Sequence, residues 1–468
     1  MINPVSKVFS LIAVAVCALL LGCSKSDLDI LKDKAAAGNA DAQLELGSVY
    51  ANGTGTSVNY AEAMKWFTLA ADAGKAVAAR NIGIMYSRGQ GTHQDLQAAV
   101  VWYRKAADAS DAKAQYLLGD AYANGTGVSR DEQQALKWFK ASAKAGHPAA
   151  LTRIGAMHLE GQGVPINIQE AVNLFKDAAE QGDPVANAIL GSMFKKGTVL
   201  EKNLEAAAHY FKRAADGGNR AAKVELAVMM LSGKGVPQDR VTAERMLTEA
   251  ADQGVPEAQY HMAMLKAFGS YVPNFYAAAD LLKSSAAQGH ADSQAFLATL
   301  YQEGKGVVKD DREALRLFNA AAAGGSASAQ NSLGVIHRDG IEVPRSFQEA
   351  EKWFRKSAEG GDLSGQTNYG SLLYSAGRYS ESFIWSQKAA LRGDATSQYN
   401  MGAMYNNGLG VMVDRVLAYA WVNLAASGEE KLPRAQRLRD SMERTLSYQQ
   451  IVRAQAETAK LKELIKSE

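Results

Sequence analysis

The sequence predicts an all-α fold, a solenoid of about eleven consecutive helix pairs. Three observations predict it: a small residue recurs at a nearly constant interval, an aromatic or leucine pair follows most of these small residues, and a glycine closes nearly every repeat. A single compact core stops growing at roughly 250–300 residues. A chain of 468 residues can exceed that limit as a repeat array, because each repeat then contacts only its neighbours.

The small residue sets the register of the repeats. It recurs every 36 residues, with one step of 35 and one of 32, at Gly47, Gly83, Gly119, Gly155, Gly191, Ala227, Ala263, Ala298, Gly334, Gly370 and Gly402. In the first repeat Ala42, Leu46 and Tyr50 form the apolar stripe of an α-helix, which we name helix A. Glycine within a helix costs about 1 kcal/mol relative to alanine. We therefore expect either a neighbouring backbone or the bulky Trp66 to approach Gly47 closely.

The second helix of each repeat, helix B, carries the aromatic or leucine pair, as in Trp66 and Phe67. A residue able to cap the free amides of its first turn stands seven positions before the pair, and a glycine suited to a helix C-terminus stands eight positions after it, or seven in the last repeat. The predicted caps are Asn59, Asp95, Asp131, Asn167, Asn203, Asp239, Asn274, Asp310, Ser346 and Asp414. The predicted terminal glycines are Gly74, Gly146, Gly182, Gly218, Gly254, Gly289, Gly325, Gly361, Gly393 and Gly428.

Glycine pairs of the form GxG connect helix A to helix B in most repeats. A GxG alone could indicate phosphate binding, but none of these extends to a dinucleotide or Walker pattern, and none follows a strand pattern. We interpret them as turns between helices. The tenth repeat has lost four residues of this loop, around Gly377 and Arg378.

These positions together resemble the Sel1-like repeat, a relative of the tetratricopeptide repeat, from about Leu28 to Gly428. The resemblance rests on the pattern small-A-x-x-LG-x-x-Y-x-x-G-x-G-V, followed by D-x-x-x-A-x-x-W-[FY]-x-x-A-A-x-x-G. Repeats six to eight are degenerate, with Met246-Leu247 and Leu281-Leu282 at the aromatic pair. The resemblance implies a right-handed superhelix of antiparallel helix pairs that serves as an adaptor or scaffold.

The first residues are typical of an exported lipoprotein. One cation, Lys7, precedes an apolar run from Val8 to Leu21 that is too short to span a bilayer comfortably. The quartet Leu20-Leu21-Gly22-Cys23 resembles a bacterial lipobox, whose cysteine carries the lipid. Ser24 follows it, which favours the outer membrane of a Gram-negative cell. An ordinary cleaved signal, giving a soluble periplasmic or secreted protein, is the alternative.

The sequence thus divides into four segments. We expect a lipoprotein signal peptide over residues 1–22 and a lipidated tether over 23–27, with the lipid on Cys23 and the protein in the cell envelope, facing the periplasm. The solenoid should cover residues 28–428, beginning with an unpaired helix B. Residues 429–468 should form two helices that cap it, and a coiled-coil partner site is the alternative for this tail.

Composition and spacing disfavour several chemical functions. The 51 basic and 49 acidic residues nearly balance, so nucleic acid is not an expected partner. Only Cys17 and Cys23 exist, which leaves the mature chain without a disulfide or a thiol ligand. The seven histidines show no pair at metal-binding spacing, and no nucleophile system stands out. We expect no catalytic residue, metal or cofactor.

The positions of helix A outside its core stripe are the candidate partner-binding residues. Stacked side by side, they should line a concave surface. Many are asparagines, which donate and accept hydrogen bonds and so suit extended peptide backbone. The candidates two residues before or five residues after the small residue are Glu45, Asn52, Asn81, Arg88, Asn124, Arg153, Glu160, Asn368 and Asn400.

The sequence therefore predicts a non-enzymatic scaffold of the bacterial cell envelope. It should bind an envelope protein in its concave groove and attach to the membrane through its lipid. One alternative is a β-lactam-binding or hydrolysing enzyme of the Sel1-like type, although those members carry a cysteine pair in each repeat and this chain has none. A lipoprotein of a polysaccharide-export assembly is another alternative.

Overall fold

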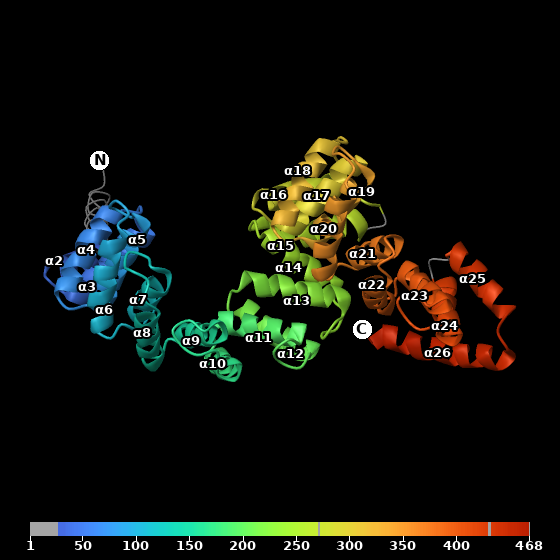
Figure 1. Ribbon diagram of the computed structural model, residues 1–468. Helices are drawn as coiled ribbons and strands as arrows, with labels where there is room; N and C mark the ends of the chain where they lie inside the picture. Colours follow the sequence, from blue (N-terminus) through green and yellow to red (C-terminus); the bar gives the residue numbers. More distant parts are fainter. Residues whose placement is uncertain (1–26, 270–271, 429–431, 468) are drawn as a thin grey trace, which may run out of the picture. The chain divides into compact units, whose positions relative to one another are not determined.

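The computed structural model describes residues 27–269, 272–428 and 432–467, which form 25 α-helices and no strand (Figure 1). The all-α prediction is confirmed for this part of the chain. Cys23 and the predicted signal peptide lie outside the described residues. The first described helix, α2 (Asp27–Ala36), begins inside the predicted tether.

Helices A and B alternate along the chain, and each has 13 residues. The A helices are α3 (Ala40–Asn52), α5 (Ala76–Arg88), α7 (Ala112–Asn124), α9 (Pro148–Glu160), α11 (Pro184–Lys196), α13 (Arg220–Ser232), α15 (Pro256–Phe268), α17 (Ala291–Glu303), α19 (Ala327–Asp339), α21 (Leu363–Ser375) and α23 (Ala395–Asn407). The B helices are α4 (Tyr60–Asp72), α6 (Leu96–Asp108), α8 (Glu132–Lys144), α10 (Ile168–Glu180), α12 (Leu204–Asp216), α14 (Arg240–Asp252), α16 (Phe275–Ala287), α18 (Asp311–Ala323), α20 (Phe347–Glu359), α22 (Tyr379–Leu391) and α24 (Arg415–Ser427).

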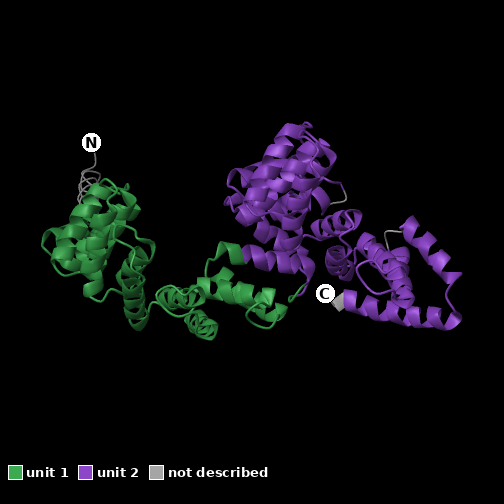
Figure 2. Ribbon diagram, in the orientation of Figure 1, with its two compact units in different colours: residues 1–222, 234–236 green, residues 223–233, 237–468 purple. Residues whose placement is uncertain are grey.

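The chain divides into two compact units (Figure 2). Residues 1–222 and 234–236 form unit 1, and residues 223–233 and 237–468 form unit 2. Within each unit, a helix B packs between the helix A of its own repeat and the helix A of the next repeat. This packing is the stacking expected of a solenoid.

The predicted caps begin the B helices as expected. The Asn59 side chain accepts a hydrogen bond from the Glu62 amide at 3.1 Å, and Asp131 accepts one from Gln134 at 2.9 Å. The predicted terminal glycines have positive φ, for example +86° at Gly74. Gly428 is the exception: it stands seven positions after Trp421, the place that Ala73 occupies in the first repeat, and its φ is −68°, near the −80° of Ala73.

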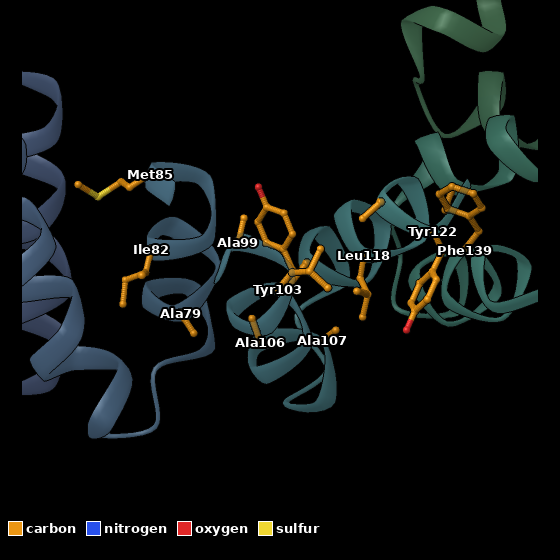
Figure 3. Packing of buried hydrophobic residues seen from close by; sticks show 14 of the residues in the cluster. Ala79, Ile82, Met85, Ala99, Tyr103, Ala106, Ala107, Leu118, Tyr122 and Phe139 are labelled. Carbon is orange, nitrogen blue, oxygen red and sulfur yellow. The ribbon is translucent and has the colours of Figure 1, made fainter. Parts of the chain in front are cut away.

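The core of each repeat is built around the second aromatic residue of the pair. The prediction that Trp66 approaches Gly47 is wrong: a Cβ at Gly47 would lie 2.6 Å from Cδ1 of Phe67. Phe67 is buried against helix A, whereas Trp66, one residue earlier and about 100° away around the helix, is only half-buried. Figure 3 shows the equivalent rings of Tyr103 and Phe139 among their buried neighbours.

The loops between helices A and B connect each repeat to the one before it. The second glycine of the GxG lies against the first turn of the preceding helix B. A Cβ at Gly91 would be 2.7 Å from the carbonyl oxygen of Tyr60, and a Cβ at Gly127 would overlap the carbonyl oxygen of Leu96. Both glycines also have positive φ. The contact is therefore made by backbone, at a place where a side chain does not fit.

Additional helices pack at both ends of the array. Helix α2 packs against α3 through Ala35, at the place where an unpaired helix B was expected. Two C-terminal helices follow the repeats, α25 (Pro433–Glu443) and α26 (Tyr448–Ser467). The Ser447 amide donates to Oε1 of Gln450 at 2.9 Å, in a capping box at the start of α26. Leu461 and Ile465 of α26 pack on the last two repeats.

A candidate groove along the A helices

The A helices line the inner side of each stack. Consecutive A helices contact each other at α9–α11 in unit 1 and at α17–α19, α19–α21 and α21–α23 in unit 2. No two B helices of the described residues make comparable contacts. The free positions of helix A therefore face a surface on which successive repeats approach one another.

Three hollows on this surface occupy equivalent places in three pairs of repeats. Hollow I, of about 420 Å³, lies between α3, α4 and α5. Hollow II, of about 310 Å³, lies between α7, α8 and α9. Hollow III, of about 690 Å³, lies between α19, α20 and α21. Hollows I and II belong to unit 1, and hollow III belongs to unit 2.

The structure brings most of the predicted candidates together in these hollows. Asn52, Asn81 and Arg88 line hollow I. Hollow II is lined by the equivalent residues of later repeats, which are Asn124, Arg153 and Glu160. Asn368 lines hollow III.

Two candidates are placed differently. Glu45 lines a separate hollow between α2 and α3, beside Lys34 and Asp41. Asn400 is only 9% exposed, and its side-chain amide donates to Oγ of Ser371 at 3.4 Å. Ser371 lines hollow III, so Asn400 supports the wall of that hollow without facing into it.

The charged residues of the groove differ in how firmly they are held. Arg153 forms an ion pair with Asp120 of the preceding helix A, and its guanidinium lies 5.7 Å from the ring centroid of Phe139. Arg88 is exposed and makes no ion pair with the described residues. Glu160 is also exposed and accepts a hydrogen bond from Gln162 at 2.6 Å. Arg88 and Glu160 are therefore the charges most accessible to a partner.

Sequence reasoning missed the floor of the hollows. The buried aromatic ring of helix B reaches each of them, as Phe67, Phe139 and Phe354. A residue two positions after the small residue adds an apolar wall, for example Met85 in hollow I. The sequence did contain a signal for these residues, because they recur at the same place in each repeat. The repeat pattern, however, assigned them to the core alone.

The described residues contain no group of three His, Cys, Asp or Glu side chains placed to hold a metal ion. His147 is half-buried, and its ring centroid lies 5.0 Å from that of Tyr116. Burial lowers the pKa of His147 and raises the pKa of Tyr116, so both side chains are neutral near pH 7. No helix of the described residues has the length and hydropathy needed to cross a membrane.

Comparisons with known proteins agree with this geometry. The Sel1 repeat model matches eleven segments, at residues 40–75, 76–111, 112–147, 148–183, 184–219, 220–255, 256–290, 291–326, 327–362, 364–394 and 395–429. No curated protein matches the chain.

Solved structures are also similar. The protein c5321 of uropathogenic Escherichia coli, described as a protective antigen with an SLR fold, is 32% identical, and the match covers 94% of this chain and 95% of that chain with a TM-score of 0.60. A Sel1 repeat protein from Oxalobacter formigenes is 28% identical over 52% of this chain and 96% of its own, with a TM-score of 0.44. The eleven matched repeats and the similarity to c5321 show that this chain belongs to the Sel1 repeat family.

Proposed function

We propose that this protein is a non-enzymatic scaffold of the bacterial cell envelope that binds a protein partner along its A helices. Sel1 repeat proteins act as scaffolds for protein–protein interactions. The observation that carries the proposal is the recurrence of one hollow at equivalent places, with polar residues at its sides and an aromatic ring at its floor.

This arrangement suits an extended polypeptide. Asparagines such as Asn52 and Asn81 can donate to and accept from peptide groups, while rings such as Phe67 offer apolar contact to side chains. Because equivalent hollows occur in different repeats, a partner can occupy more than one of them, and linked contacts raise the overall affinity.

A charge exchange in the groove tests the proposal. The double variant Arg88→Glu with Glu160→Lys keeps the net charge and alters two exposed side chains, so folding should change by less than about 0.5 kcal/mol. We expect partner recovery after crosslinking in intact envelopes to fall about ten-fold, because complementary charges become repulsive. The measurement is quantitative mass spectrometry of the crosslinked partner, with circular dichroism to confirm helical content.

The matched control exchanges two exposed charges on B helices of the same unit. Lys140→Glu with Glu205→Lys also keeps the net charge and lies away from the hollows. It should leave recovery unchanged. Equal loss in both variants, or no loss in either, would place the partner elsewhere than on the A helices.

The envelope location depends on the lipid anchor. Ser24 to Ser26 separate Cys23 from α2, and three residues reach at most about 11 Å. An acylated Cys23 would therefore hold the first repeat close to the membrane surface. The description of the E. coli relative as a protective antigen supports an envelope location.

Acylation of Cys23 is directly testable. Mass spectrometry of the mature protein should find Cys23 as the N-terminal residue, carrying lipid. We expect more than one acyl chain, because a single chain gives only marginal membrane binding. Cys23→Ala should remove the protein from the membrane fraction of cells. A mature chain that begins elsewhere, or that has an unmodified Cys23, contradicts the anchor while leaving the scaffold proposal standing.

A further inference from the structure

The tenth repeat lacks the loop that covers the preceding helix B in other repeats. Elsewhere the second loop glycine lies against the first residue of that helix, in the pairs Gly91 with Tyr60, Gly127 with Leu96, Gly163 with Glu132, Gly235 with Leu204, Gly306 with Phe275 and Gly410 with Tyr379. In the tenth repeat, α21 ends at Ser375 and α22 begins at Tyr379. A Cβ at Gly377 in this short turn would meet no atom within 4 Å. The first turn of α20 is therefore not covered by a loop.

This missing cover leaves an aromatic ring open. Phe347, the first residue of α20, is 58% exposed, although Arg345 lies 4.6 Å from its ring centroid. Its aromatic counterparts Tyr60, Phe275 and Tyr379, which loop glycines cover, are each half-buried. Among these four aromatic residues, Phe347 is the one without a loop glycine beside it, and it is the one that is exposed.

The same gap enlarges hollow III. Its volume of about 690 Å³ exceeds the 310 and 420 Å³ of hollows II and I. It reaches Gln348 and Glu351 on the first turns of α20, whose counterparts do not line the other two hollows. Glu351 is already paired with Arg378 at 2.5 Å. Phe347, Phe354 and Leu372 give the hollow apolar walls of the kind found in ligand sites.

Gln348 provides an available hydrogen-bond donor at this place. Its counterpart in the third repeat is Gln133, the second residue of α8, and Nε2 of Gln133 donates to the carbonyl oxygen of loop residue Gly163 at 2.7 Å. The side chain of Gln348 is exposed and makes no hydrogen bond with the described residues. The carbonyl that it would meet is absent because the tenth repeat has no such loop.

We propose that hollow III binds a short extended peptide of a partner protein, in which a small residue precedes valine or another aliphatic residue. The chain's own loops indicate this chemistry, because a half-buried valine follows the GxG and packs on the core at Val128, Val164 and Val307. The peptide would lie where a loop lies in other repeats, with a backbone carbonyl on Gln348. This inference rests on the proposed scaffold function and specifies one of its binding sites.

A loop peptide tests the site directly. The probe is a fluorescent peptide with the sequence of residues 122–131, titrated with the purified full-length chain and followed by anisotropy. We expect saturable binding, weakened about ten-fold by Phe347→Ala because this ring forms one wall of the hollow. The matched control is Ile168→Ala, at the same position of α10 and 51% exposed, which should bind as the unaltered chain does.

Restoring the loop should close the site. Replacing residues 376–378 with residues 408–414 of the next repeat adds the four missing residues, and we expect peptide binding to be lost. Circular dichroism checks that this variant folds. If it does not fold, the comparison of peptide binding by Phe347→Ala and by the unaltered chain decides whether hollow III is the binding site. Absence of saturable binding at millimolar peptide, equal binding by Phe347→Ala, or equal binding of a peptide with Val128→Asp would each overturn the inference. The charge exchange at Arg88 and Glu160 lies in unit 1, so its result stands independently of these outcomes.

Discussion

Phe175→Ala should lower the free energy of unfolding by about 3–5 kcal/mol, the range for deleting a fully buried aromatic side chain. Phe175 is 0% exposed, and its ring lies where a Cβ at Gly155 would be only 2.8 Å away. Truncation would leave a cavity between α9 and α10 that Gly155 cannot fill. The measurement is urea unfolding followed by circular dichroism.

Leu174→Ala is the matched control, one residue earlier on the same helix. Leu174 is only half-buried, so its truncation should cost about 1–2 kcal/mol. Hydrogen exchange should rise mainly in the fourth repeat and its neighbours, because stability in a repeat array is a sum of local terms. Equal costs for the two variants, or exchange that rises uniformly along the chain, would contradict this description of the core.

Gly127→Ala should have the second large effect, about 2–5 kcal/mol. A residue with a side chain costs about 1–2 kcal/mol at the φ of +71° that Gly127 adopts, and overpacking typically adds about 1–3 kcal/mol. The overlap is with the backbone carbonyl of Leu96, which cannot move aside as a flexible side chain can. The measurement is the shift in the urea midpoint.

Gly55→Ala separates the two contributions. Gly55 occupies the same loop position in the first repeat and has a φ of +72°, but a Cβ there would meet no atom within 4 Å. It should show only the cost of about 1–2 kcal/mol for the conformation. If Gly127→Ala is no more destabilising than Gly55→Ala, the loops do not contribute to the coupling between repeats.

The sequence predicted those features that depend on neighbours along the chain. Caps such as Asn59 and Asp131 could be placed because a capping side chain bonds an amide three residues away. The terminal glycines followed for the same reason, and Gly428 failed because it stands one position closer to its aromatic residue than the other terminal glycines do. The repeat register and the family resemblance rest on these local signals.

Features that depend on how a helix packs against another helix could not be predicted. Trp66 and Phe67 both lie within the apolar stripe of helix B, and only the packed helix A shows which ring meets Gly47. Asn400 stands at the same place in its repeat as the other groove candidates, yet its neighbour Ser371 and the adjoining helices bury it. The four missing residues were visible in the sequence. Their effect on Phe347 required knowing what the loop covers in other repeats.

The contact between a loop glycine and the preceding helix also governs how such a chain can change its length. It joins a glycine to a backbone carbonyl, so it makes no demand on the side chains of either repeat. In-frame duplication or excision of one 36-residue copy, such as residues 112–147, leaves the same backbone contact on both sides of the junction. At these loops, copy number can therefore vary by unequal recombination without a new kind of backbone contact having to arise. A longer descendant would then differ from a shorter one in how many partner segments it can hold at once.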